Sequence, residues 1–132
     1  MAQGLARAGF DLDLKFGQAR EESLAWVIGD AKIEVKSDQA CRRTGNLFVE
    51  YRQKGRPSGI AVTEADYWAF EYDDGCWLLV PIDKLKRICR RVWRDHPERR
   101  KPGGDYGHYD GVLIPISWLV PNGKPDWQDT TW

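Results

Sequence analysis

The chain has 132 residues, of which 42% are hydrophobic and 30% charged, and its 20 basic and 20 acidic side chains cancel. This length favours a single domain over residues 1–132, with a core at about 10–119 and a tail at 120–132. No apolar run approaches the roughly 20 residues of a membrane span, so we expect no membrane partner. The first residues also lack the apolar segment of a secretory signal.

The cysteines and histidines argue against disulfides and zinc. Cys41, Cys76 and Cys89 are odd in number and no two lie close in sequence, which is typical of reduced thiols in the cytoplasm. The chain has neither a CxxC nor an HExxH motif, and His96 and His108 are expected in loops. Zinc therefore has no candidate ligand set.

Hydrophobic periodicity in the N-terminal part predicts a helix between two extended segments. Residues 10–14 alternate between apolar and acidic side chains, which predicts a short strand or an extended lead-in. At residues 18–28 the apolar side chains recur at helical spacing, and Gly29 follows as a C-cap. Residues 32–37 alternate again and predict a strand.

The middle of the chain is predicted to contain two strands and a short helix. Residues 41–46 are polar and end in a turn signal, and residues 47–51 are rich in strand-forming side chains. Residues 63–70 are interpreted as the short helix, with Thr63 as its N-cap and an aromatic face. The apolar run at 76–81 predicts a strand buried on both faces.

The C-terminal part is predicted to form a basic helix and a final strand. Residues 82–95 predict a helix whose inward side chains are Leu85, Ile88, Val92 and Cys89. Residues 101–105 are expected to form a mobile loop, and residues 112–116 the last strand. Residues 78–85 and 112–119 both have a strand, a proline and then a helix start with a polar N-cap, which indicates repeated strand-to-helix chemistry rather than a duplicated domain.

Basic residues are concentrated despite the zero net charge. From Lys84 to Lys101 there are nine basic side chains and two acidic ones, which suits either a phosphate-binding surface or a solvated helix face. The residues expected to contact a nucleic-acid backbone are Arg42, Arg43, Arg52, Lys54, Arg56, Lys86, Arg90 and Arg94.

The candidate catalytic pair is Glu34 and Lys36. The pattern acid-x-Lys occurs three times, at 13–15, 30–32 and 34–36, but only the last lies inside a β-branched alternation that follows a helix carrying acids. Two residues apart on one strand face, Glu34 and Lys36 are about 6–7 Å apart at Cα. The carboxylate could hold a divalent cation while the lysine reaches the same phosphate. The pair therefore predicts a metal-dependent nuclease site.

A second carboxylate is needed for the cation, and several remain candidates. Asp30 lies about 13 Å from Glu34 along an extended strand, so it needs a bend in the chain. If the two predicted strands form an antiparallel hairpin across residues 38–46, Glu50 lies opposite Glu34 with Cβ atoms about 5 Å apart. Asp38, just past the strand, and Glu22, on the helix, could also join; for both, a solvated carboxylate is the alternative.

Several segments together resemble the PD-(D/E)XK nuclease superfamily, and more narrowly a phage-encoded group of small nuclease-like proteins. The resemblance covers about residues 10–90 and a final strand, and it rests on the segments Ile33-Glu34-Val35-Lys36-Ser37-Asp38, Thr44-Gly45-Asn46-Leu47-Phe48-Val49-Glu50-Tyr51, Ser58-Gly59-Ile60, Ala65-Asp66-Tyr67-Trp68 and Leu113-Ile114-Pro115.

This resemblance implies an α/β fold (α+β, with a mixed sheet) that has a restriction-endonuclease-like αβββαβ core, in which helices flank a central sheet. It also implies phosphodiester hydrolysis with Mg²⁺ or Mn²⁺. It also implies Glu34 as a metal ligand, Lys36 as the phosphate-facing lysine and Glu22 as the helix acid. The superfamily usually has an aspartate on the preceding strand, whereas here only Asp30 precedes Glu34. Either Asp30 is a displaced version, or Glu34 takes that role and Glu50 supplies the next ligand.

We therefore expect a metal-dependent nuclease that cleaves DNA, with RNA left open. No sequence-reading motif is present, so structure-selective or weakly specific cleavage is expected. Two alternatives are a non-catalytic nucleic-acid-binding module on the same fold and a phage interaction protein whose tryptophans form a partner surface. A homodimer remains open, and the expected location is the cytoplasm, that of the host if the protein is phage-encoded.

Overall fold

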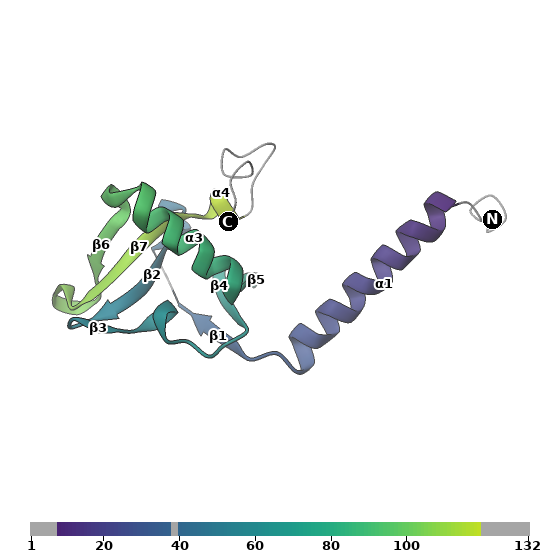
Figure 1. Cartoon of the computed structure of the whole chain (residues 1–132), viewed down its shortest axis with the longest axis horizontal. Coiled ribbons are helices and arrows are strands. Elements are labelled where there is room, and N and C mark those ends of the chain that lie inside the picture. Colours follow the sequence, from purple (N-terminus) through teal and green to yellow (C-terminus); the bar gives the residue numbers. More distant parts are fainter. Residues whose placement is uncertain (1–7, 38–39, 120–132) are drawn as a thin grey trace. The chain divides into compact units, whose positions relative to one another are not determined.

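The computed structural model describes residues 8–37 and 40–119, and it divides into two compact units, Met1–Lys32 and Ile33–Trp132. The first unit contributes one long helix, α1 (Ala8–Gly29) (Figure 1). The strands among the described residues all lie in the second unit.

Helix α1 confirms the helix predicted at 18–28 and its end at Gly29, but it begins ten residues earlier, at Ala8. The strand or extended lead-in predicted at 10–14 is therefore wrong. A five-residue segment does not distinguish a strand from a helix, because side chains four apart share one face in both structures. Once the neighbouring turns are helical, extending the helix adds one hydrogen bond per residue fixed.

The second unit combines helices with two sheets, which confirms the expected α+β class. The described strands do not form the one central sheet that the resemblance implied. The first sheet has the order β1-β4-β5, with strands β1 (Ile33–Lys36), β4 (Tyr67–Asp73) and β5 (Cys76–Pro81). The second has the order β3-β2-β7-β6, with strands β3 (Arg56–Pro57), β2 (Asn46–Gln53), β7 (Tyr109–Pro115) and β6 (Arg100–Gly103).

Short helices connect these strands, and one longer helix, α3, lies against β5 and β7 (Figure 1). Their bounds are α2 (Cys41–Thr44), η2 (Gly59–Ala61), α3 (Ile82–Asp95), η3 (Pro97–Arg99), η4 (Asp105–Gly107) and α4 (Ile116–Leu119). Within residues 8–37 and 40–119, no helix combines the length and the apolar character needed to cross a membrane.

The strand pairing corrects the predicted hairpin. Strand β1 pairs in parallel with β4, which sets Glu34 beside Trp68. Strand β2 instead pairs with β7, so Glu50 lies opposite Gly111 in the other sheet. The alternation within each strand was correct, but alternation alone carries no information about which strand is the partner. A parallel partner requires a long crossover, and here α2, β2, β3 and η2 all lie between β1 and β4.

The short helix predicted at 63–70 is wrong, because this segment enters strand β4. Its aromatic side chains favour a pleated, half-buried surface, and Trp68 and Phe70 are both buried in the core. Thr63 is not a helix N-cap; its hydroxyl accepts a hydrogen bond from the Ala65 backbone N–H at 3.2 Å. The prediction assumed the helical spacing of 3.6 residues, whereas strand β4 follows the two-residue spacing of a strand.

Three further segments differ from the prediction in detail. The polar loop predicted at 41–46 contains the short helix α2, anchored by the buried Cys41. The mobile loop predicted at 101–105 overlaps strand β6, which pairs with β7. Strand β5 is confirmed, but only Val80 is buried in it, because β5 is an edge strand rather than one covered on both faces. The tail at 120–132 lies outside the described residues.

Helix α3 is confirmed with its predicted bounds, and its four predicted inward side chains are all buried. They pack in one core with residues of both sheets, including Trp68, Val80, Leu47 and Ile114. The repeated strand-to-helix connection is also confirmed: β5 leads into α3 and β7 into α4, each after a proline. The polar N-cap predicted for α3 is wrong, since Pro81 holds that position without a side-chain cap.

Gly59 allows the connection η2 to approach strand β2 closely. Its φ is +54°, and a Cβ atom at this position would lie 2.3 Å from the Glu50 carbonyl oxygen. Any larger residue would therefore meet rigid backbone as well as an unfavourable dihedral. This approach brings Ile60 into the core and fixes the segment that leads to Thr63.

Candidate functional site

Glu34 and Lys36 lie side by side on edge strand β1, as the alternation predicts. The Lys36 Nζ atom is 2.5 Å from Glu34 Oε2, and the two side chains are 31% and 40% exposed, respectively. The strand face that carries Glu34 and Lys36 is more buried than the opposite face, on which Ile33 and Val35 are exposed. The cause is Trp68 on the neighbouring strand, over whose ring the Lys36 ammonium lies at 4.1 Å.

Thr63 and Trp68 complete a group of four that we call the Glu34 cluster (Glu34, Lys36, Thr63 and Trp68). The Thr63 hydroxyl donates to Glu34 Oε1 at 3.0 Å. The buried Trp68 donates its indole N–H to the same oxygen at 3.1 Å and lies 3.2 Å from the Thr63 hydroxyl. Two neutral donors and the Lys36 ammonium therefore hold the carboxylate in one orientation. Sequence reasoning missed this role of Thr63, because its predicted place was a helix cap.

Two opposing effects act on the pKa of Glu34. Partial burial raises it, while hydrogen bonds from Lys36, Thr63 and Trp68 and the charge of Lys36 lower it. The net pKa is below the ordinary value of 4.5. The cluster is therefore built for the anionic form of the carboxylate.

The lowered pKa of Glu34 predicts a stability contribution that depends on pH. Because the folded pKa lies below the unfolded one, the contribution is present above the ordinary carboxyl pKa and is lost as pH falls through the folded value. In urea unfolding near neutral pH, the free energy of unfolding of Glu34→Gln should be lower than that of the wild type by up to about 1 kcal/mol, since the pair is partly exposed. This difference should shrink in acid, and a difference that is constant with pH would contradict the assignment.

The structure does not bring Glu50 to Glu34, so the predicted carboxylate pair is wrong. Glu50 lies in the other sheet, opposite Gly111. Glu22 and Asp30 belong to the first unit, which is described by itself, and Asp38 lies outside the described residues. Among residues 8–37 and 40–119, no group of three or more His, Cys, Asp or Glu side chains could hold a metal ion.

The donor chemistry of the Glu34 cluster therefore fits a divalent cation only in part. A hard cation requires several oxygen ligands, and the cluster supplies one carboxylate and one hydroxyl. The ammonium of Lys36 already neutralises that carboxylate. A bound cation would need further oxygen ligands beyond these two.

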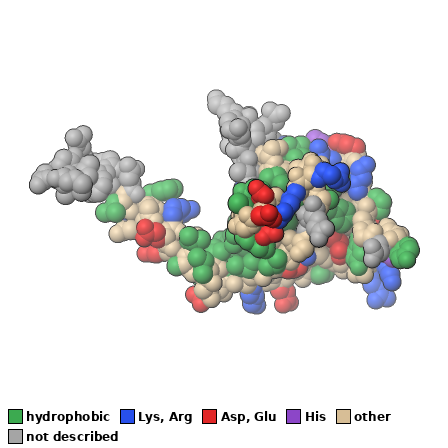
Figure 2. Space-filling view, turned by 180° about the vertical axis from the view of Figure 1, so that it is seen from behind, with side chains coloured by type: hydrophobic (Ala, Val, Ile, Leu, Met, Phe, Trp, Pro, Cys, Tyr) green, Lys and Arg blue, Asp and Glu red, His purple; other side chains and the backbone are tan. Residues whose placement is uncertain are grey.

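The basic residues predicted to contact nucleic acid separate into two groups. Arg42 pairs with Glu71 and Asp74 at 3.0 and 2.7 Å, and Arg52 pairs with Asp110 at 2.7 Å. The other basic residues of this set have no ion pair with another element in the described part of the chain. On the face shown in Figure 2, basic, acidic and apolar side chains are interspersed rather than separated into one charged field.

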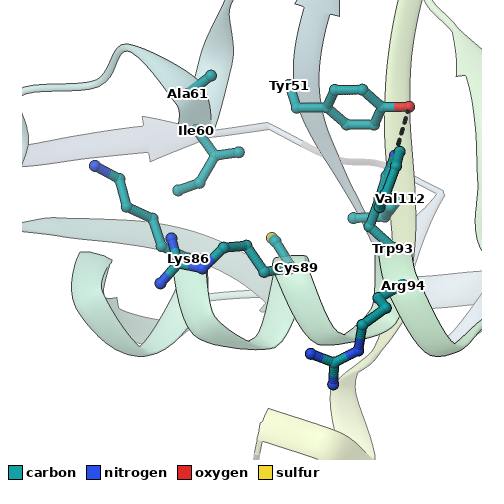
Figure 3. A pocket seen from close by; sticks show the side chains of 9 residues that line it. Tyr51, Ile60, Ala61, Lys86, Cys89, Trp93, Arg94 and Val112 are labelled. Carbon is teal, nitrogen blue, oxygen red and sulfur yellow. Dashed lines mark hydrogen bonds between the residues drawn. The ribbon is translucent and has the colours of Figure 1, made fainter. Parts of the chain in front are cut away.

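Lys86, Arg90 and Arg94 line a pocket of about 730 Å³ beside helix α3 (Figure 3). We call it the α3 pocket; its other lining residues are Tyr51, Ile60, Ala61, Cys89, Trp93 and Val112. The Trp93 indole N–H donates to the Tyr51 hydroxyl at 3.3 Å across the pocket wall. Sequence reasoning missed Trp93. The available signal was an aromatic side chain three residues after Arg90 on the basic helix.

The chain was compared with protein-family models, curated proteins and solved structures. No match was found in any of the three.

Proposed function

We propose that this protein is a metal-dependent nuclease, with DNA as its expected substrate, in which Glu34 and Lys36 form the centre of the active site. The observation that carries the proposal is the Glu34–Lys36 contact at 2.5 Å on a partly exposed strand face. An anionic oxygen ligand beside an ammonium is the combination that phosphodiester hydrolysis needs. The resemblance of this segment to the PD-(D/E)XK nucleases adds to the same proposal.

Each residue of the Glu34 cluster has a role in this proposal. Glu34 would be one oxygen ligand of Mg²⁺ or Mn²⁺. The cation, when bound, would supply an activated water and offset charge on the phosphate. Lys36 would turn from Glu34 to the phosphate, and Thr63 and Trp68 would keep the Glu34 carboxylate oriented.

The test is cleavage of labelled single-stranded, branched and duplex DNA by the full chain. Cleavage is expected with Mg²⁺ or Mn²⁺, and none with EDTA, because the cation supplies the activated water. Glu34→Gln should reduce the rate at least about 100-fold. The matched control is Glu71→Gln, which removes another partly exposed carboxylate that pairs with a basic side chain. Equal rates for wild type and Glu34→Gln would reject the site.

A second candidate is a nucleic-acid-binding module without catalysis. It is favoured by the absence of a group of three or more His, Cys, Asp or Glu side chains able to hold a metal among the described residues. It is also favoured by the two neutral donors and one ammonium that already surround the Glu34 carboxylate. This alternative predicts binding that is the same with Mg²⁺ and with EDTA, and no cleavage of any substrate form. The cleavage assay above therefore separates the two candidates.

A further inference from the structure

The α3 pocket has an apolar interior. Ile60 and Val112 are buried and come from η2 and β7, on the side of the pocket that faces the helix (Figure 3). Cys89 is also buried, and its burial raises the pKa of its thiol to about 12, although Arg90 opposes the shift. This thiol is therefore protonated at neutral pH and serves as part of the wall rather than as a nucleophile.

Three cations follow one edge of the pocket. Lys86, Arg90 and Arg94 are spaced four residues apart on α3, so they lie on one helix face and recur about every 6 Å. Lys86 and Arg90 have no ion pair among the described residues, and Arg94 forms only an exposed pair with its neighbour Asp95. The row is therefore available to a ligand that carries several negative charges in a line.

An aromatic surface is held in place at the same pocket. The Trp93 side chain is 45% exposed, yet both its ring and its backbone are fixed. The Arg100 guanidinium lies 3.8 Å from the indole centre and donates to the Trp93 carbonyl at 2.7 Å. Tyr51 accepts from the indole N–H. A ring that is already ordered loses little entropy when a planar ligand packs on it.

We propose that the α3 pocket binds an unpaired nucleotide of a single-stranded nucleic acid. The base would pack in the apolar pocket against Trp93 and Tyr51, and the phosphates would follow the row Lys86, Arg90 and Arg94. Aromatic side chains beside a basic track bind single strands of any sequence, because every base offers a planar face. A paired base would first have to leave its stack, and an acidic peptide would leave the aromatic surface without a planar partner.

The inference deepens the proposed function and rests on it for one statement, that strands with unpaired nucleotides are the nuclease substrate. Ala61, in the pocket wall, precedes Thr63 of the Glu34 cluster by two residues. Two residues of extended chain span at most about 7 Å. The pocket and the Glu34 cluster therefore adjoin, and a strand held in the pocket is close to the proposed catalytic pair.

The test is binding of a labelled oligothymidylate of about 12 nucleotides, and of a duplex of equal length, to the full chain in EDTA. The single strand should bind more tightly. Trp93→Leu, which keeps an apolar wall, should weaken single-strand binding at least about fivefold and leave duplex binding unchanged. The double variant Lys86→Gln/Arg90→Gln should reduce the slope of log K against log salt by about 1.4.

Two further variants keep the test decisive. Ala61→Phe fills the pocket from an exposed position without removing any charge, so it should weaken single-strand binding as Trp93→Leu does, even if Trp93→Leu fails to fold. Arg87→Gln removes an exposed cation of the same helix that does not line the pocket, and it should change binding less than twofold.

The pocket assignment is overturned if the duplex binds as tightly as the single strand, or if Ala61→Phe binds the single strand normally. It is also overturned if Arg87→Gln weakens binding as much as the double variant Lys86→Gln/Arg90→Gln, or if a glutamate-rich peptide competes as well as the oligonucleotide. Pocket-dependent binding without cleavage would reject only the nuclease, whereas metal-dependent cleavage without pocket-dependent binding would reject only the pocket.

Discussion

Replacement of Trp68 by alanine is expected to lower the free energy of unfolding by about 3–5 kcal/mol. Trp68 is 1% exposed and lies in the core that both sheets share with helix α3. Its ring meets Phe70 edge-on, with centroids 6.2 Å apart, and its indole N–H is a donor to Glu34. The substitution therefore opens a large cavity and removes one donor from a carboxylate. Chemical denaturation followed by circular dichroism measures the change.

Trp77 provides the matched control for Trp68. It lies on strand β5, next to β4, and is 45% exposed, so Trp77→Ala should cost less than about 1 kcal/mol. Trp68→Phe keeps an aromatic ring and removes the indole donor, so its cost should fall between the two alanine variants. If Trp77→Ala were as destabilising as Trp68→Ala, the core would lie elsewhere than in this structure.

Replacement of Lys36 by methionine is expected to reduce metal-dependent cleavage at least about 100-fold, if the proposed function is right. Methionine keeps an unbranched apolar stem over the Trp68 ring, where the ammonium now lies at 4.1 Å, so folding should be preserved. Only the positive charge beside Glu34 and the phosphate is lost. Single-turnover cleavage with saturating Mg²⁺ measures the rate, and binding in EDTA measures the affinity.

The control for Lys36 is Lys101→Met, which removes an exposed lysine from strand β6 of the other sheet. Lys101→Met should change the cleavage rate less than about threefold, because one distant phosphate contact affects binding rather than the chemical step. Equal rate losses in the two variants would mean that Lys36 acts only through general charge. A loss of affinity without a loss of rate would place Lys36 in binding and not in catalysis.

The sequence alone predicted those elements whose signal lies within one segment. Helix α3 was predicted with its bounds and its buried face, because its apolar side chains recur at helical spacing against a basic remainder. Strands β1, β2, β5 and β7 were predicted from β-branched and aromatic side chains. The contact between Glu34 and Lys36 was also predicted, since side chains two apart on a strand share a face whatever the strand pairs with.

The short segments show where local patterns fail. At 10–14 and 63–70, a few apolar residues fitted both periods, and the flanking structure decided between them. Residues 10–14 became helix because they continue α1. Residues 67–70 became strand because Trp68 and Phe70 are buried between partners on both sides, β1 and β5.

Composition and local periodicity by themselves determined that this chain folds around an α+β core, with a basic helix and with an acid and a lysine side by side on one strand. Only the tertiary structure decided their neighbours: Trp68 and Thr63 around Glu34, Glu50 in a separate sheet, and Trp93 and Tyr51 at a pocket beside the cations. The physical reason is that a strand's side-chain alternation is fixed by its own backbone, whereas its partner is chosen by how all the apolar faces can be buried together.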